Sequence, residues 1–198
     1  MRVLVSTIFS AEPTILAATR FSPDRIIGLV SEEPTAEQTK AVELVKNSLG
    51  SVLQFSVRKI PPYDVVKTAD IVATMIDTLS SDDELIFNVT SGRKTQSMGV
   101  LFGAYARATR VRKIVYLADD KKTVVHLPIL SFSFNETEKA LLEAIEDGRY
   151  ESTALLAEAI DRSPAMVYRA LDELKRQDYV EVTDTGFKLT DAGRIARL

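Results

Sequence analysis

Glu84-Leu-Ile-Phe-Asn-Val-Thr-Ser-Gly-Arg-Lys94 is the stretch that decides the fold of this 198-residue chain. Its first half, Glu84 to Val89, is a short apolar run of β-forming residues, which is too short for a helix and predicts a buried strand. Thr90 to Gly92 favour turns and helix caps. The segment from Thr95 to Ala108 is rich in small residues and predicts a helix. The stretch therefore reads as a strand, a polar turn and the start of a helix.

The turn offers several groups that bind anions. The N–H groups of a first helical turn lack intrahelical partners and carry partial positive charge. Gly92 lets a ligand approach the backbone closely, and Arg93 and Lys94 add two cations. We therefore predict a phosphate-binding turn in which Thr90 and Ser91 cap the helix or contact the ligand. The alternative is an ordinary capped connection with both cations solvated. The turn is neither a Walker loop nor a dinucleotide-binding fingerprint, because it has one glycine.

Strand and helix patterns alternate on both sides of this stretch. Strands are predicted over 2–7, 25–31, 52–57, 84–89, 113–118 and 123–130, and helices over 12–20, 36–49, 63–79 and 95–108. The polar turn 119–122 is too short for a parallel crossover, so the sixth strand is predicted to pair with the fifth as an antiparallel hairpin. Residues 1–130 therefore predict an α/β domain with a mainly parallel six-stranded sheet and helices on both faces.

Two packing expectations follow from spacing. The helix over 36–49 is expected to bury Ala41, Leu44, Val45 and Leu49. Gly99 and Gly103, four residues apart on the helix after the central turn, permit close packing against the sheet or against a partner helix, and the sheet is the expected contact.

In a doubly wound sheet, ligands bind beyond the carboxyl ends of the strands, at the point where strand order reverses. The loops after the first and fourth strands are expected to meet there. The predicted ligand-binding residues are Thr7, Ile8, Phe9, Ser10, Asn88, Thr90, Ser91, Gly92, Arg93 and Lys94. Because the first loop has no glycine, nicotinamide binding is excluded.

Residues 131–198 predict a second domain. Asn135, Ser152 and Ser163-Pro164 start three helices, over 136–147, 153–160 and 164–177. A hairpin over 179–190 and a short helix from Asp191 follow. Three helices and a hairpin predict a winged helix-turn-helix, whose third helix would enter a DNA major groove. The predicted DNA-binding residues are Arg162, Ser163, Ala165, Met166, Tyr168, Arg169, Arg176 and Lys188.

The charge of this second domain allows an alternative. From Asn135 onward the chain has nine cations and fourteen acids, whereas DNA affinity usually rests on neutralising phosphates. The alternative is therefore a winged helix that serves only dimerisation or protein contact.

Composition narrows the chemistry. The absence of cysteine excludes disulfides, zinc ribbons and cysteine nucleophiles, and the single histidine, His126, argues against a histidine metal site or a Ser-His-Asp triad. No apolar run is long enough for a membrane span, and the N-terminus has no signal-peptide pattern. We expect a cytoplasmic protein that has no metal, cofactor or membrane partner.

Asn88-Val-Thr-Ser-Gly-Arg-Lys94 after a fourth strand, together with a C-terminal winged helix, resembles the CRISPR-associated Rossmann-fold (CARF) regulators. Archaeal CARF–winged-helix transcription regulators are the most similar type, and the resemblance covers both domains. It implies a Rossmann-like domain in a homodimer that binds cyclic oligoadenylate, above all cyclic tetra-adenylate, across its two-fold axis. It also implies winged helices that act on double-stranded DNA at promoters of CRISPR loci, and hence association with the nucleoid.

The resemblance places the family's loops on residues 7–10 and 88–94. Many relatives have two glycines where this chain has Ser91-Gly92, so the ring size of the ligand stays open. Our first interpretation is a regulator without catalytic residues. The rival is a metal-independent ring nuclease, in which the ligand's own 2′-hydroxyl attacks the adjacent phosphate and Lys94 stabilises the developing charge. A purely structural dimeric adaptor is the third possibility.

Overall fold

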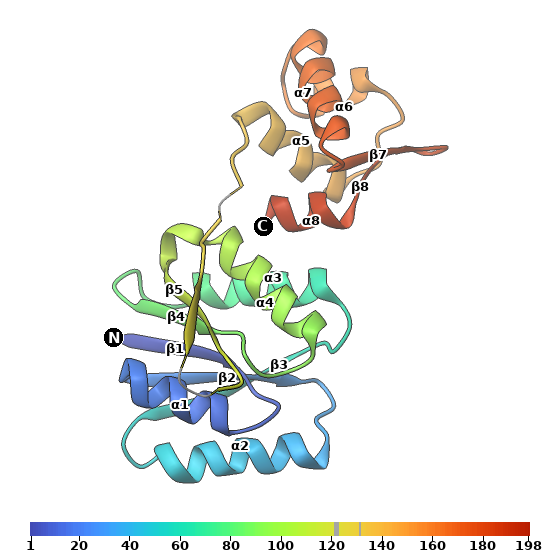
Figure 1. Cartoon of the computed structure of the whole chain (residues 1–198). Coiled ribbons are helices and arrows are strands. Elements are labelled where there is room, and N and C mark those ends of the chain that lie inside the picture. Colours follow the sequence, from blue (N-terminus) through green and yellow to red (C-terminus); the bar gives the residue numbers. More distant parts are fainter. Residues whose placement is uncertain (121–122, 131) are drawn as a thin grey trace. The chain divides into compact units, whose positions relative to one another are not determined.

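The computed structural model describes residues 1–120, 123–130 and 132–198 (Figure 1). The chain divides into two compact units, Met1–Ser131 and Phe132–Leu198. Of the predicted features, Lys121 and Lys122 of the polar turn and Ser131 at the start of the second predicted domain lie outside the described residues.

The first unit is built on one six-stranded sheet. Its strands are β1 (Arg2–Thr7), β2 (Arg25–Ser31), β3 (Gln54–Ile60), β4 (Glu84–Asn88), β5 (Val111–Leu117) and β6 (Val124–Leu127). They lie in the order β3-β2-β1-β4-β5-β6, and every neighbouring pair is parallel except β5 and β6. The predicted mainly parallel sheet with a terminal antiparallel hairpin is confirmed.

Helices cover both faces of this sheet (Figure 1). They are α1 (Glu12–Phe21), α2 (Ala36–Leu49), α3 (Val65–Asp77) and α4 (Lys94–Ala106), followed by a 3₁₀ turn (Ala108–Arg110). Because side chains alternate across a strand, Val3, Val5 and Phe87 pack in one core with residues of α3 and α4, including Val72 and Val100. Their strand neighbours face the opposite way, into cores shared with α1 and α2.

The predicted bounds of β3 and β6 and the predicted burial of Leu44 are wrong, and β6 ends at Leu127 rather than at residue 130. The third strand begins at Gln54 and continues to Ile60, because the chain first turns after α2, with the amides of Val52 and Leu53 donating to the Leu49 carbonyl. Leu44 is 54% exposed, while Ala41 and Val45 are buried. It lies at the edge of the apolar stripe, beyond the reach of the core.

Gly99 and Gly103 contact a helix, and the expectation that they face the sheet is wrong. A Cβ atom on Gly99 would lie 2.6 Å from Cβ of Thr68, and one on Gly103 would lie 2.6 Å from the carbonyl oxygen of Ala69. Both neighbours belong to α3. The two glycines therefore let the backbones of α3 and α4 approach each other closely.

The second unit consists of α5 (Glu136–Asp147), α6 (Thr153–Ala159), α7 (Pro164–Arg176), β7 (Val180–Thr183), β8 (Gly186–Leu189) and α8 (Asp191–Arg197). The predicted caps are present: the side chains of Asn135, Ser152 and Ser163 accept hydrogen bonds from the first turns of α5, α6 and α7. Leu141, Leu171 and their neighbours form a separate core. Among the helices of the described residues, none combines the length and the apolar character that crossing a membrane requires.

Candidate functional site

The loops after β1 and β4 start side by side. These strands are neighbours in the sheet, and Ser6 is paired with Asn88. The crossovers from β1 lead to one side of the sheet and those from β4 to the other, so strand order reverses between them. Such a switch point is where open α/β sheets place their ligands. The expected meeting of the two loops is observed.

The Ser91 side chain joins the two loops. Its Oγ accepts hydrogen bonds from the backbone amides of Phe9, at 2.9 Å, and Ser10, at 3.0 Å. The Thr7 hydroxyl donates in return to the Ser91 carbonyl. Ser91, Thr7 and Ile8 are all buried. Their contacts fix the shape of the site from inside.

Asn88 and Thr90 form a second internal network. The buried Asn88 amide donates to Ser6 Oγ, at 3.0 Å, and to the Pro13 carbonyl, at 3.2 Å. The Thr90 hydroxyl donates to Asn88 Oδ1 and accepts from the Leu117 amide at 2.8 Å. Asn88 and Thr90 were predicted to contact a ligand, and in this structure their side chains form hydrogen bonds within the protein.

Thr90 and Ser91 do not cap α4, so of their two predicted roles the capping role is wrong and contact with the ligand stays a prediction. The N-cap residue is Arg93, whose amide donates to the Gln96 side chain at 3.4 Å. Gly92 has φ of +95°, a conformation that L side chains rarely adopt. The glycine gives the turn this backbone conformation, and α4 begins at Lys94, one residue before the predicted start at residue 95.

The outer surface of the turn carries the exposed members of the predicted set. Arg93 and Lys94 are exposed, as are Phe9 and Ser10 across the junction. The first-turn amides of α4 lie in the same segment, and they carry partial positive charge. The exposed surface thus combines two cations with a helix N-terminus, a combination that attracts phosphate.

Sequence reasoning missed Tyr63, which lies beside this surface. The Arg93 guanidinium carbon is 5.1 Å from the centroid of the Tyr63 ring, and the tyrosine is 70% exposed. The sequence offers one signal, an aromatic residue directly after Pro61-Pro62. In the structure this segment follows the carboxyl end of β3.

The opposite flank of the β4 loop is acidic. A pocket of about 150 Å³ lies there, lined by Glu12, Pro13, Leu16, Thr90, Leu117, Ala118 and Asp119. Its two carboxylates repel phosphate. An anionic ligand is therefore expected to place its phosphates on the side of Arg93 and Lys94.

The groups with displaced pKa values lie at the other end of α4. The hydrogen bonds from Arg107 lower the pKa of Asp77, and burial raises the pKa of Tyr105. Arg107 donates to both Asp77 carboxylate oxygens, at 2.7 and 2.8 Å. Among the described residues, no cluster of acidic and histidine side chains is suited to hold a metal ion.

The predicted DNA-binding residues all lie on exposed positions of α7, the turn before it and the hairpin. Tyr168 and Met166 are 64% and 49% exposed. Ser163 is the N-cap of α7. Arg176 forms an ion pair with Glu173, and Lys188 Nζ lies 3.5 Å from Glu181. Two side chains that were predicted to contact phosphate are therefore already paired with a carboxylate of the same unit.

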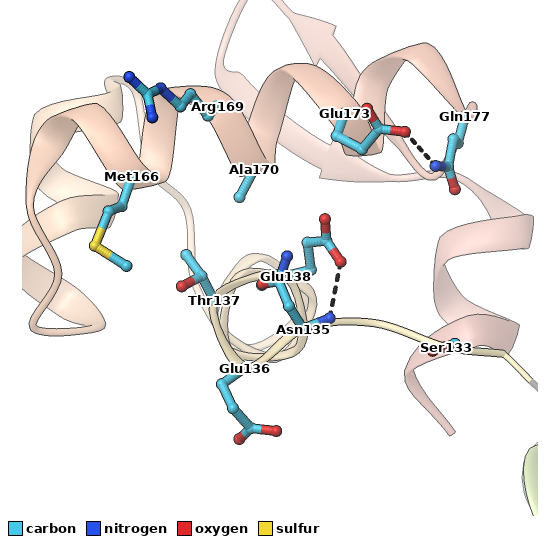
Figure 2. Close-up of a pocket in the computed structure, with 10 residues that line it drawn as sticks. All are labelled: Ser133, Asn135, Glu136, Thr137, Glu138, Met166, Arg169, Ala170, Glu173 and Gln177. Carbon is cyan, nitrogen blue, oxygen red and sulfur yellow. Dashed lines mark hydrogen bonds between the residues drawn. The ribbon is translucent and has the colours of Figure 1, made fainter.

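Arg169 borders a groove between α7 and the first turn of α5 (Figure 2). The groove has a volume of about 780 Å³ and is lined by Ser133, Asn135, Glu136, Thr137, Glu138, Met166, Arg169, Ala170, Glu173 and Gln177. Figure 2 shows the Arg169 side chain directed away from α5. Because three carboxylates line the groove, the groove itself repels a nucleic acid. The Arg169 side chain extends out of the groove (Figure 2).

Residues 14–128 match the model of the Csa3 CRISPR-associated Rossmann-like domain. The chain belongs to this family. The match runs from α1 past the end of β6, so it includes the turn after β4 but not the second unit. No curated protein sequence matches this Csa3-family chain at a significant level.

Solved structures support the fold of the Csa3-family chain. Can2 from Sulfobacillus thermosulfidooxidans, in complex with cyclic tetra-adenylate, is similar with a TM-score of 0.54 and 15% identity over 99% of this chain. Enterococcus italicus Csm6, bound to cyclic hexa-2′-fluoro-hexa-dAMP, is similar with a TM-score of 0.53 and 12% identity over 90% of this chain. The chain spans 64% of the first protein and 55% of the second.

Proposed function

We propose that this Csa3-family chain is a regulator whose first unit binds a cyclic oligoadenylate and whose second unit binds DNA as a winged helix-turn-helix. The observation that carries the proposal is the pair of loops joined through Ser91 beside the exposed Arg93 and Lys94. Family membership and the ligands bound to Can2 and Csm6 support the ligand class. Cyclic tetra-adenylate is our first candidate.

The charge pattern suits such a ligand in a homodimer. A cyclic oligonucleotide carries one phosphate per nucleotide around a ring. Two copies of the chain related by a two-fold axis would present two copies of Arg93 and Lys94 to opposite sides of that ring. Charge-assisted hydrogen bonds of this kind are about twice as strong as neutral ones.

The order of elements in the second unit supports the DNA-binding part. Three helices precede a β-hairpin, and four residues separate the end of α6 at Ala159 from the start of α7 at Pro164, a short connection like that of a helix-turn-helix. Its outward side chains Tyr168 and Arg169 are exposed. α7 is therefore the helix that we expect in the major groove.

Calorimetry on the full chain tests the ligand. Cyclic tetra-adenylate, cyclic hexa-adenylate and linear tetra-adenylate are titrated separately, and light scattering records the oligomeric state. We expect cyclic tetra-adenylate to bind at one ring per dimer and linear tetra-adenylate to bind more weakly. If the chain binds neither ring, the proposed function is wrong and a purely structural dimeric adaptor is the alternative that remains.

A second experiment separates the regulator from the ring nuclease. Purified chain is incubated with a large excess of labelled cyclic tetra-adenylate, and products are followed over time. A regulator returns the ring intact. Multiple turnovers to linear product would identify an enzyme. A 2′,3′-cyclic phosphate at one end and a free 5′-hydroxyl at the other would show that the ligand's 2′-hydroxyl attacks the phosphate and the 5′-oxygen leaves, with Lys94 and the α4 amides stabilising the phosphate charge.

A further inference from the structure

An aromatic ring and a guanidinium group are stacked at the rim of the candidate site. Arg93 lies over the Tyr63 ring, with its guanidinium carbon 5.1 Å from the ring centroid. Both side chains are exposed, and 70% of the tyrosine surface remains accessible. The pair therefore presents flat, polarisable surface to solvent next to the first-turn amides of α4.

The backbone beneath Tyr63 is fastened to the start of α4. Thr95 Oγ1 donates to the Pro62 carbonyl at 2.6 Å. The buried Gln96 side chain donates to Ser31 Oγ at 3.2 Å and to the Ile60 carbonyl at 3.4 Å. The segment after β3 and the turn after β4 are thus held in one arrangement, although their strands are separated by two others in the sheet.

We propose that Tyr63 and Arg93 form a stacking platform for a nucleobase of the bound oligonucleotide. This inference rests on the proposed function and concerns the same site. Unpaired bases stack on aromatic rings and on guanidinium planes. Lys94, one residue beyond Arg93, provides a point charge for phosphate and no stacking plane. A base therefore stacks on the Tyr63–Arg93 pair, and the phosphates are bound by Lys94, the α4 amides and the N–H groups at the edge of the Arg93 plane.

The test compares tyrosine variants of the full chain in calorimetry with cyclic tetra-adenylate at several salt concentrations. Because stacking on an aromatic side chain is worth about 1–3 kcal/mol per base, Tyr63→Ala is expected to weaken binding about fivefold to a hundredfold. Tyr63→Phe keeps the ring and is expected to bind like the wild type. Tyr116→Ala removes another exposed tyrosine, on β5, and serves as the matched control.

Salt dependence distinguishes stacking from charge. The slope of log K against log salt reports phosphate contacts, at about 0.7 per contact for a single strand. Tyr63→Ala is expected to leave this slope unchanged, whereas Lys94→Ala is expected to reduce it. Arg93→Lys keeps the charge but loses the plane, so it is expected to lower affinity without flattening the slope.

A readout without ligand examines the platform itself. The Arg93 Nε–H resonance in the free protein is expected to shift on Tyr63→Ala, because the ring current of the tyrosine is lost. Equal affinities for wild type and Tyr63→Ala, or an unmoved Arg93 resonance, overturn the platform while the proposed function stands. A wild-type chain that binds no cyclic oligoadenylate contradicts the function, and the platform with it. Thermal unfolding verifies that each variant is folded.

Discussion

At the scale of single residues, Arg93 and Lys94 are the side chains on which affinity should depend. Both are exposed, so alanine is tolerated at either position. Hydrogen bonds to charged groups contribute about 1.5–3 kcal/mol. Lys94→Ala and Arg93→Ala are each expected to weaken cyclic tetra-adenylate binding about tenfold to a hundredfold, measured by calorimetry. Lys40→Ala, which removes an exposed lysine of α2, is the control. Unchanged affinity in the double variant would place the site elsewhere.

The same residues show how far sequence reasoning reached. The strand, the turn and the helix of this stretch were predictable, because Glu84 to Lys94 contains the local signals of each, and the meeting of its turn with the loop after β1 followed from the sheet. Which hydroxyls face inward was not predictable. Ser91 and Thr90 accept hydrogen bonds from the amides of Phe9, Ser10 and Leu117, and those partners come from the loop after β1 and from β5. Tyr63 was missed for the same reason, since it reaches Arg93 from the segment after β3.

At the scale of elements, the contact between α3 and α4 is set by two glycines. Alanine usually stabilises a helix relative to glycine, by about 1 kcal/mol. Here the sign reverses, because the added Cβ would lie 2.6 Å from Thr68 Cβ at Gly99 and 2.6 Å from the Ala69 carbonyl oxygen at Gly103. Gly99→Ala and Gly103→Ala are each expected to lower the free energy of unfolding by about 1–3 kcal/mol. Denaturant unfolding measures this. Met98→Ala, at a position on α4 that is 52% exposed, should cost much less, and equal losses would contradict the glycine argument.

The far ends of the same helices are joined by Asp77 and Arg107. The pKa of Asp77 is lowered in the folded state, chiefly by the hydrogen bonds from Arg107. The pair therefore stabilises the fold at pH values above the unfolded carboxyl pKa of about 3.9, and the contribution is lost as pH falls through the lower folded pKa. Since Asp77 is 48% exposed, Asp77→Asn is expected to lower the free energy of unfolding at pH 7 by at most about 1 kcal/mol. The unfolding free energies of both proteins should converge once the pH falls below the folded pKa of Asp77. A difference that persists there would show that the loss has another cause.

Elements with strong local signals were predicted well, and tertiary contacts were not. The bounds of β1, β2 and α5 match the expectation, because an apolar pattern marks each of them and the cap residue Asn135 marks the start of α5. The start of β3 and the burial of Leu44 depend on how α2 leaves the sheet. No spacing rule contains that information.

At the scale of the whole molecule, the second unit is expected to act on DNA through α7. An arginine can contact guanine in a bidentate manner, worth about 1–3 kcal/mol of discrimination. Arg169→Ala is therefore expected to abolish the preference for the operator over random DNA. Lys188→Ala, which removes a phosphate contact, is expected to weaken binding to both about equally. Mobility-shift titrations on the promoter of the CRISPR locus measure both variants. Equal binding by wild type and Arg169→Ala at moderate salt, with and without cyclic tetra-adenylate, would make the second unit an assembly element.

Arg176 and Lys188 form ion pairs with Glu173 and Glu181. Because of these pairs, the salt dependence of DNA binding should underestimate the number of phosphate contacts. When a phosphate takes up a cation that already holds a carboxylate, it displaces a tethered acid of the same chain, and fewer ions are freed from the DNA atmosphere per new contact. The slope of log K against log salt, about 0.9 per phosphate for free cations on duplex DNA, should therefore fall short of the number of contacts made. Glu173→Gln and Glu181→Gln remove the internal competitors. These variants should bind random DNA more tightly and with a steeper slope, so the acidic partners act as a brake on indiscriminate binding.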